Sequence, residues 1–225
     1  MKVTFITDSY GNLRIHNNIE EVDKQSTYPE LVKKQLLSLG YIVHVDAAGY
    51  RKVTDLPFLY EKYNDSDVYV IQLGIVDAYP RILSLKNTLS KSLIAKGLRK
   101  IIRKNRPFFI NYIHNKPWTS EVVFRKAINN ICSISQSTLI WINIAPVNEF
   151  QEKETPGANK SIIKYNEILS NEIKKYGHCT LLNIFDLFMQ NEDYEKYMHP
   201  IDSHLNVLGN KMYANELLKI IDQKK

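Results

Sequence analysis

A three-layer α/β/α sandwich with a mostly parallel, five-stranded sheet is the fold class that this sequence predicts. Short apolar segments alternate with longer segments of helical periodicity, the order expected of parallel strands joined by helices. The apolar segments are continuous runs, as is typical of strands that helices cover on both faces. No linker or repeat interrupts the pattern, so we expect a single domain over residues 1–225.

The first half of the chain supplies three of these strands. Its expected elements are a strand at 3–7, a helix at 28–39, a strand at 41–45, a short helix at 56–63 and a strand at 67–73. A long polar connection over 8–27 follows the first strand. Pro29 suits the first turn of the helix, and Gly40 stops it.

The second half is expected to complete the sheet and both helical layers. Its elements are one long helix or two over 82–104, a helix at 120–135, a strand at 138–144, a helix at 161–176, a strand at 180–184 and a closing helix at 205–221. The aromatic segment 108–116 is ambiguous, and 149–159 is expected to be a polar loop.

Composition limits the classes of function. The net charge is +6, and much of the excess lies over 96–106, which we interpret as the solvated face of a helix. The alternative is attraction of an anionic substrate or surface. We expect no nucleic-acid partner, because no recognition motif accompanies these charges. Cys132 and Cys179 lack metal-site spacing and are expected to be free thiols.

The first residues and the lengths of the apolar runs bear on the location of the protein. The first strand begins at Val3 with no charged leader, and no apolar run approaches ~18 residues. We therefore expect no membrane span and a cytoplasmic location. Oligomeric state is not predicted.

Three side chains from opposite ends of the chain suggest a catalytic site. Ser9 follows the first strand, and Asp202 and His204 precede the last helix. A serine hydroxyl becomes a nucleophile when a base takes its proton, which is the role predicted for His204. Asp202 would orient the imidazole and stabilise its charged form. The structural alternative for Ser9 is a turn residue, and for Asp202 or Ser203 it is the N-cap of the helix.

Glycines after two other strands are candidates for an oxyanion hole. Gly49 and Gly74 each follow a strand end, where a backbone N–H without a side chain can approach a developing oxyanion. Ligands in parallel sheets bind outside the carboxyl ends of the strands, so one edge can gather these segments with Ser9. The alternative for each glycine is a turn that needs a positive φ.

These segments together resemble the sequence blocks of the SGNH, or GDSL-type, hydrolase superfamily. The four blocks are Thr7-Asp8-Ser9-Tyr10, Ala48-Gly49, Leu73-Gly74-Ile75-Val76-Asp77 and Asp202-Ser203-His204-Leu205-Asn206, in the family's order. The resemblance implies a flavodoxin-like sandwich of SGNH type and a Ser-His-Asp triad. It also implies hydrolysis or transfer of an ester-linked acyl group, with no metal or organic cofactor.

The chain departs from the family's pattern in the oxyanion hole. Val76 stands where the family has an asparagine, and loss of one such donor costs roughly 10²–10³ in rate in a well-studied hydrolase. The N–H groups of Ser9, Gly49 and Gly74 would then hold the oxyanion, with Asn12 and Arg14 as possible recruits.

Substrate contacts are expected from residues within or beside these blocks, namely Asp8, Asn12, Arg14, Asp77 and Arg81. An arginine can hold an anionic substrate group bidentately, which is the role considered for Arg14 and Arg81. A structural salt bridge is the alternative for both.

Four functions remain open at this point. The first is a serine esterase acting on a small-molecule or glycan ester, and the second is an O-acyltransferase of polysaccharide biosynthesis with the same triad. A phosphate- or flavin-binding flavodoxin-like module would use the loop after the first strand as a cradle. A catalytically dead binding protein is the fourth, because of Val76.

Overall fold

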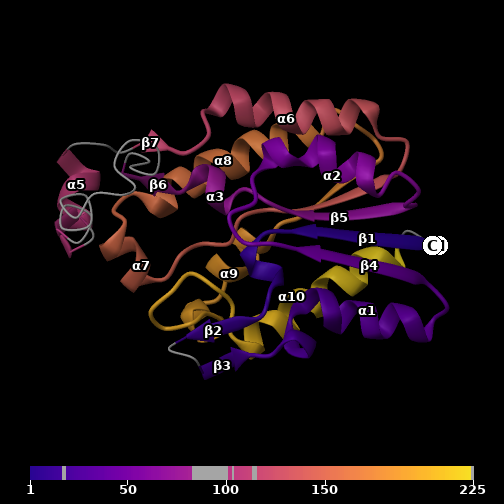
Figure 1. Cartoon of the computed structure of the whole chain (residues 1–225), viewed down its shortest axis with the longest axis horizontal. Coiled ribbons are helices and arrows are strands. Elements are labelled where there is room, and N and C mark those ends of the chain that lie inside the picture. The colour runs from indigo at the N-terminus through magenta and orange to yellow at the C-terminus, as the bar shows by residue number, and fades with distance from the viewer. Residues whose placement is uncertain (17–18, 83–100, 103, 113–115, 224–225) are drawn as a thin grey trace, which may run out of the picture.

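A computed structural model describes residues 1–16, 19–82, 101–102, 104–112 and 116–223. Five strands form one parallel sheet in the order β4-β1-β5-β8-β9 (Figure 1). They are β1 (Lys2–Thr7), β4 (Ile42–Ala47), β5 (Val68–Gln72), β8 (Thr138–Ile142) and β9 (Cys179–Leu182). The parallel sheet between helices confirms the predicted fold class.

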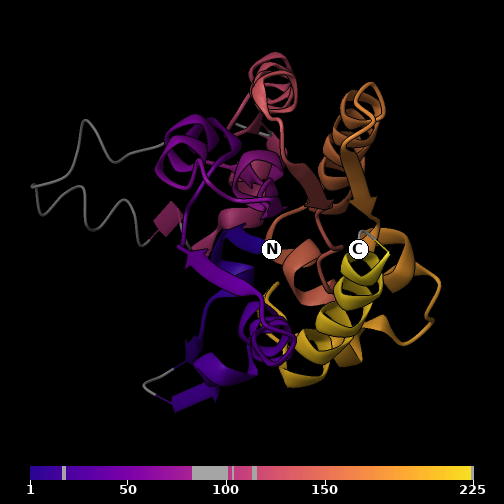
Figure 2. The ribbon, with the colours of Figure 1, turned by 90° about the vertical axis from the view of Figure 1, so that its right-hand side faces the viewer.

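Helices cover both faces of the sheet (Figures 1 and 2). On one face lie α1 (Tyr28–Ser38), α9 (Ile184–Met189) and α10 (Val207–Asp222), and on the other lie α2 (Leu56–Lys62), α3 (Ile75–Ala78), α6 (Glu121–Ile134) and α8 (Ala158–Ile173). The core between them is apolar; Phe5 on β1 and Trp141 on β8 are both fully buried. Burial of both strand faces explains why the strands are continuous apolar runs.

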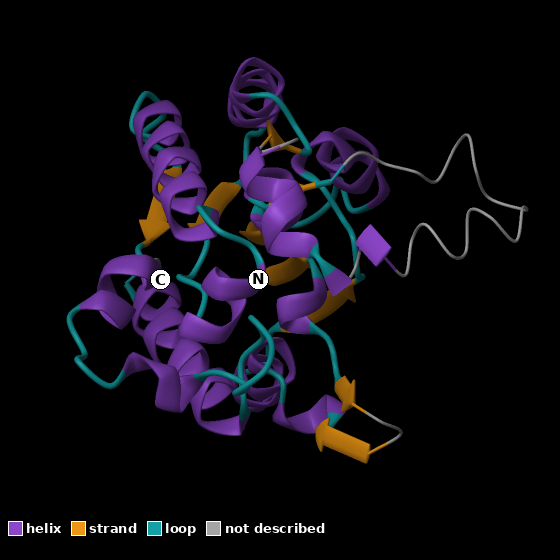
Figure 3. Ribbon diagram, turned by 90° about the vertical axis from the view of Figure 1, so that its left-hand side faces the viewer, coloured by secondary structure: helices purple, strands orange, loops and turns teal. Residues whose placement is uncertain are grey.

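The strand order brings the first three strand ends together. β1 lies between β4 and β5, and Thr7 at its end pairs with Ala47 and with Gln72. The loops that follow these strands therefore begin side by side, and Figure 3 views the molecule from this edge. The helix α10 begins at the same edge, because its chain direction opposes that of the strands.

Several short elements differ from the sequence prediction. Two small antiparallel pairs form, β2 (Arg14–His16) with β3 (Ile19–Val22) and β6 (Pro80–Arg81) with β7 (Lys116–Pro117). Helices α5 (Arg106–Tyr112) and α7 (Glu149–Glu154) lie where an ambiguous segment and a loop were expected. Elements of two to seven residues are too short for hydrophobic periodicity to reveal them. Most of the helix predicted over 82–104 lies outside the described residues, and so does most of the charged segment 96–106.

Two features bear on the other predictions. Within the described part of the chain, no helix has the length and apolarity that crossing a membrane requires. Cys132 and Cys179 are free thiols, as predicted, although α6 and β9 bring their sulfur atoms to 3.5 Å.

Candidate active site

The turn after β1 holds the candidate nucleophile. Ser9 begins a 3-10 helix, Ser9–Gly11, and the Asp8 carboxyl group caps it by accepting the Tyr10 N–H at 3.0 Å. A Cβ atom at Gly11 would lie 2.1 Å from the Thr7 hydroxyl oxygen, so only glycine allows the chain to fold back this closely. The turn thus fixes the Ser9 side chain at the carboxyl edge of the sheet.

The structure brings the three side chains of the predicted triad together. The Ser9 Oγ lies 2.8 Å from Nε2 of His204. The other ring nitrogen, Nδ1, contacts Oδ1 of Asp202, which also accepts the His204 backbone N–H at 2.6 Å. The two side chains are only about one-fifth exposed, at 22% for His204 and 18% for Asp202. A continuous path therefore connects the serine hydroxyl through the imidazole to a carboxylate.

The loop that carries Asp202 and His204 is closed at its base by backbone contacts. Met198 and Leu205 form an antiparallel bridge, and the His199 N–H donates to the His204 carbonyl at 2.8 Å. His199 itself is buried within this loop.

Asn206 ends the loop and begins the last helix. Its Oδ1 accepts the Gly209 N–H at 3.0 Å, and its amide nitrogen donates to the Lys196 carbonyl at 2.7 Å. Asn206 is thus the N-cap of α10, where Asp202 or Ser203 was the alternative considered from the sequence. The Asp202 carboxylate can therefore orient His204 instead.

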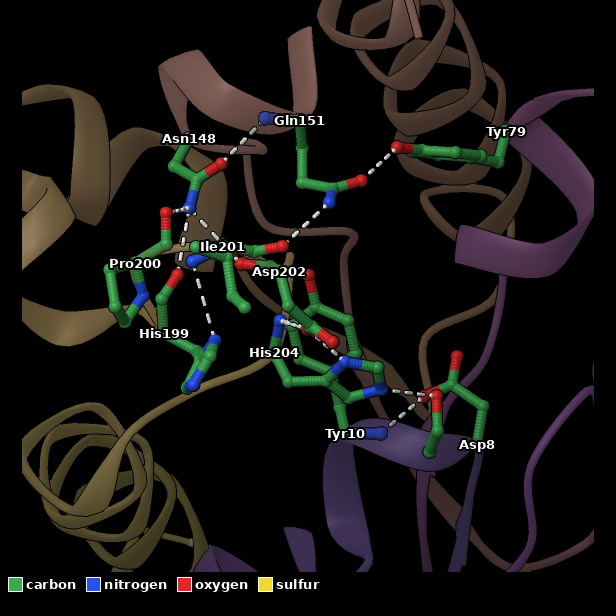
Figure 4. Close-up of polar contacts among 11 residues, drawn as sticks. Asp8, Tyr10, Tyr79, Asn148, Gln151, His199, Pro200, Ile201, Asp202 and His204 are labelled. Carbon is green, nitrogen blue, oxygen red and sulfur yellow. Dashed lines mark hydrogen bonds and ion pairs between the residues drawn. The ribbon is translucent and has the colours of Figure 1, made fainter. Parts of the chain in front are cut away.

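A buried amide in the segment between β8 and α7 contacts the same loop (Figure 4). Asn148 is 2% exposed, and its Nδ2 donates to the carbonyls of His199, Pro200 and Asp202 at 2.8, 3.3 and 3.1 Å. Its Oδ1 accepts the Gln151 N–H at 2.8 Å and caps α7. Asn148 thus holds the loop that carries Asp202 and His204, and we expect it to position these two side chains without contacting Ser9.

We expect Asn148→Asp to lower kcat at least about tenfold, because a 1 Å displacement of catalytic groups costs up to about 10² in rate. Aspartate still caps α7, but it has no N–H and leaves the loop carbonyls without their donor. KM should change little, and steady-state kinetics on a 4-nitrophenyl ester measure both constants. Asn148→Ser, which also retains a capping oxygen, is the comparison; wild-type kcat in both variants would contradict the positioning role.

Ser9 and His204 line a pocket of about 300 Å³. It is lined by Ser9, Tyr10, Gly49, Tyr50, Ile75, Val76, Tyr79, Arg81, Gln151, Ser203 and His204. Gly49 reaches it on the loop after β4, and Arg51 fixes that loop by donating to the carbonyls of Thr7 and Asp46 at 3.1 and 2.6 Å. No atom lies within 4 Å of the position that a Gly49 Cβ would occupy, so this side of the glycine is open.

The loop after β5 brings an apolar side chain to the pocket. Val76 lines it, at the place where the family resemblance implies an asparagine. Gly74 is not among the lining residues; its φ is +131° and a Cβ would lie 2.9 Å from Ile144 Cδ1. The glycine is therefore needed for backbone conformation and packing. Of the three predicted oxyanion donors, Ser9, Gly49 and Gly74, only Ser9 and Gly49 line the pocket and remain candidates.

Two carboxyl groups predicted to contact substrate are buried away from the pocket. Asp77 is fully buried and accepts the Val53 N–H at 3.0 Å and the Thr119 hydroxyl. Asp8 is 1% exposed and is used in the Ser9 turn. Burial raises the pKa of Asp8 to about 7, although the hydrogen bond from the Tyr10 N–H lowers it in part. Burial likewise raises the pKa of Asp77 to about 6. We correct the prediction: both groups support the loops and are not substrate contacts.

The three remaining predicted contacts have different outcomes. Arg81 lines the pocket. Asn12 is exposed and is not a lining residue, and its side chain accepts the Leu13 N–H at 2.9 Å, so its role in the site stays a prediction. The side chain of Arg14 lies outside the described residues, so its prediction stands untested.

Sequence reasoning missed several residues of the site. The Tyr10 ring lies 5.4 Å from the His204 ring, and Tyr79 donates from its hydroxyl to Gln151 at 2.7 Å. Tyr10 lies in the first family block but was given no role, and no motif marks Tyr79 or Gln151. Asn148 follows a predicted strand, and the same edge rule indicates it. Among the described residues, no group of three or more His, Cys, Asp or Glu side chains is placed to hold a metal ion.

Comparisons with known proteins agree with the fold. No family model matches the chain. The lipase/acylhydrolase of Enterococcus faecalis superimposes with a TM-score of 0.69 at 14% identity, over 99% of this chain and 96% of that one. A protein of Parabacteroides merdae assigned as a GDSL-like lipase gives 0.61 at 12% identity, over 97% and 94%. The chain has the fold of the SGNH/GDSL-type hydrolases.

One further solved structure and one protein sequence are similar to this chain. A catalytic mutant of Axe2, an acetylxylan esterase from Geobacillus stearothermophilus, shares the SGNH-type fold with a TM-score of 0.61 at 15% identity, over 97% of this chain and 92% of that one. In sequence, the uncharacterized protein YpmR of Bacillus subtilis (strain 168) is 27% identical over 173 residues. That match covers 74% of this chain and 62%, less than two thirds, of YpmR.

Proposed function

We propose that the protein is a serine esterase that cleaves an ester-linked acyl group. The observation that carries the proposal is the contact of 2.8 Å between Ser9 Oγ and His204 Nε2, with Asp202 on the other ring nitrogen. A hydroxyl within reach of an oriented base is the arrangement that nucleophilic catalysis requires. A phosphate cradle would need no imidazole at the serine, so this contact favours the esterase over the binding module.

In the proposed mechanism, Ser9 Oγ attacks the carbonyl carbon of the ester while His204 Nε2 takes the hydroxyl proton. The Asp202 carboxylate stabilises the imidazolium that forms. The tetrahedral intermediate collapses as the bond to the leaving alcohol breaks and His204 returns the proton to that oxygen. Water then attacks the acyl-enzyme with His204 again as base, releasing the acid and the free serine.

The oxyanion of the intermediate needs donors in the same pocket. We propose the N–H groups of Ser9 and Gly49, which lie at the ends of adjacent strands and have no protein acceptor among the described residues. Val76 contributes no side-chain donor, so this hole depends on backbone groups.

We propose further that the acyl ester is carried by a carbohydrate. Acetyl xylan esterases are among the structural neighbours, although at identities at which they show the fold alone. Aromatic side chains of Tyr10, Tyr50 and Tyr79 line the pocket, and such rings supply flat apolar surface with a polar end.

Labelling with a fluorophosphonate tests the proposed nucleophile without knowledge of the substrate. The reagent phosphonylates an activated serine, and mass spectrometry of the digested protein locates the modification. We expect one adduct, on Ser9, and none after heat denaturation because the hydroxyl then has no base. Absence of labelling in the folded protein would remove the proposal.

A further inference from the structure

Two arginines packed on aromatic rings lie at one side of the pocket, one of them as a lining residue. Arg81 lines the pocket, and its guanidinium carbon lies 4.4 Å from the ring centroid of Trp118 and 5.9 Å from that of Tyr50. Arg106, at the start of α5, lies 5.6 Å from the ring of Tyr79, which is itself a lining residue. We call Arg81 and Arg106 the arginine pair.

The arginine pair has no ion-pair partner within the described part of the chain, although Asp77 acts on Arg81 at longer range. The Nε atoms of both residues are buried without a hydrogen-bond partner, and neither guanidinium forms an ion pair there. The two other arginines whose side chains are described form ion pairs: Arg51 lies 2.6 Å from Asp46, and Arg125 contacts Glu172. Burial, followed by repulsion from Arg106, lowers the pKa of Arg81. The two cations thus repel each other beside the pocket.

A half-buried charge is normally paired, because its desolvation is otherwise uncompensated. The acidic residue nearest in sequence, Asp77, is fully buried and accepts hydrogen bonds from Val53 and Thr119. An anion entering the pocket would therefore meet no competing carboxylate at this side. The Trp118 ring lies against the Arg81 guanidinium and limits its movement, while the guanidinium itself can make the two-pronged contact that arginine makes with carboxylate or phosphate.

We propose that the substrate of the Ser9 site is an ester that also bears a carboxylate or phosphate group, and that Arg81, supported by Arg106, binds that group. The inference rests on the proposed esterase function and names the substrate class of the same site. The anionic group belongs either to the acyl part or to the alcohol part of the ester, and the two positions are separable by experiment.

Two pairs of probe esters test the inference. 4-Nitrophenyl hemisuccinate is compared with 4-nitrophenyl butyrate for an anion on the acyl side. 4-Acetoxybenzoate is compared with its methyl ester for an anion on the alcohol side. The measured quantity is the anion-to-neutral ratio of kcat/KM in each variant, because comparing that ratio between variants cancels the intrinsic reactivity of the esters.

We expect Arg81→Met to lower this ratio at least about tenfold for one pair, mainly through KM, since charge-assisted contacts are among the stronger hydrogen bonds. Arg81→Lys retains the charge but loses the two-pronged guanidinium contact, so its ratio should lie between those of the wild type and Arg81→Met. Lys219→Met removes one charge from the far end of α10, where Lys219 pairs with Glu216, and should leave the ratio unchanged. Activity on the neutral esters in the Arg81 variants confirms that they are folded.

The outcomes separate the two proposals. An unchanged ratio in Arg81→Met, or wild-type protein that cleaves the neutral esters but neither anionic one, overturns the anionic substrate and leaves the esterase intact. Failure of wild-type protein to cleave any probe, together with absence of fluorophosphonate labelling at Ser9, removes the esterase and with it this inference. An anion-to-neutral ratio that falls in Arg81→Met for one pair of probe esters alone supports the inference. The pair that responds then shows whether the acyl part or the alcohol part of the substrate carries the anion.

Discussion

Ser9→Ala is expected to reduce kcat for 4-nitrophenyl butyrate at least about 10³-fold, since loss of a triad serine costs up to about 10⁶ in a well-studied protease. Alanine removes the oxygen that we propose as the nucleophile while leaving the turn formed by Asp8 and Gly11. KM and the unfolding midpoint should stay close to those of the wild type. Initial rates, corrected for spontaneous hydrolysis, give the result.

His204→Ala should cause a loss of similar size, because the serine then keeps its proton. The double variant is the decisive control. Groups that act as one unit are not additive, so Ser9→Ala with His204→Ala should be no slower than Ser9→Ala alone. Full activity in Ser9→Ala would show that another group is the nucleophile, and additive losses would show that the two side chains act separately.

Asp8→Asn is expected to stabilise the protein at pH 8 and to have less effect at pH 5. Burial raises the pKa of Asp8 from its ordinary value of 3.8 to about 7, although the hydrogen bond from the Tyr10 N–H acts in the opposite direction. Between these values the folded state binds the proton more tightly than the unfolded state, so stability falls as pH rises from about 4 to 7. Asparagine keeps the acceptor for Tyr10 and removes the charge. The gain at pH 8 is on the order of a few kcal/mol.

Urea denaturation at pH 5 and pH 8 measures this difference. Asp46→Asn is the matched control: burial raises the pKa of Asp46, but the hydrogen bonds from Arg51, Tyr63 and Lys62 outweigh it and the net shift is downward. The ionised Asp46 carboxylate stabilises the fold at every pH above its unfolded-state pKa, and this contribution is lost only as pH falls below that value. Asp46→Asn should therefore lower the free energy of unfolding by the same amount at pH 5 and at pH 8. A benefit of Asp8→Asn that does not grow with pH would contradict the buried-charge explanation.

The fold and the centre of the site were accessible from the sequence for physical reasons. Strands buried on both faces must be continuous apolar runs, and the carboxyl ends of parallel strands meet at one edge. These two rules placed Ser9 and Gly49 beside each other. Asp202 and His204, an acid and a base just before the last helix, were predicted from their residue types, and the family resemblance agreed with that prediction. The two rules gave no information on the short pairs β2–β3 and β6–β7, whose strands are two to four residues long.

Contacts made by single side chains across the fold were the part that could not be predicted. Whether a carboxyl group is buried or faces a pocket depends on tertiary packing, and so Asp8 and Asp77 were assigned to the substrate in error. The donations from Asn148 to three carbonyls have no local sequence pattern. The packing of Ile144 against Gly74 is likewise visible only in three dimensions.

Ser9 and His204 are separated by 195 positions along the chain, so their contact closes nearly the whole polypeptide. Such long-range closures carry a large entropic cost and form slowly compared with local helices. Catalytic activity would consequently be a probe of the final stage of refolding. After dilution from denaturant, helical circular dichroism should recover ahead of ester cleavage, and the interval between the two signals would time the docking of the last helix.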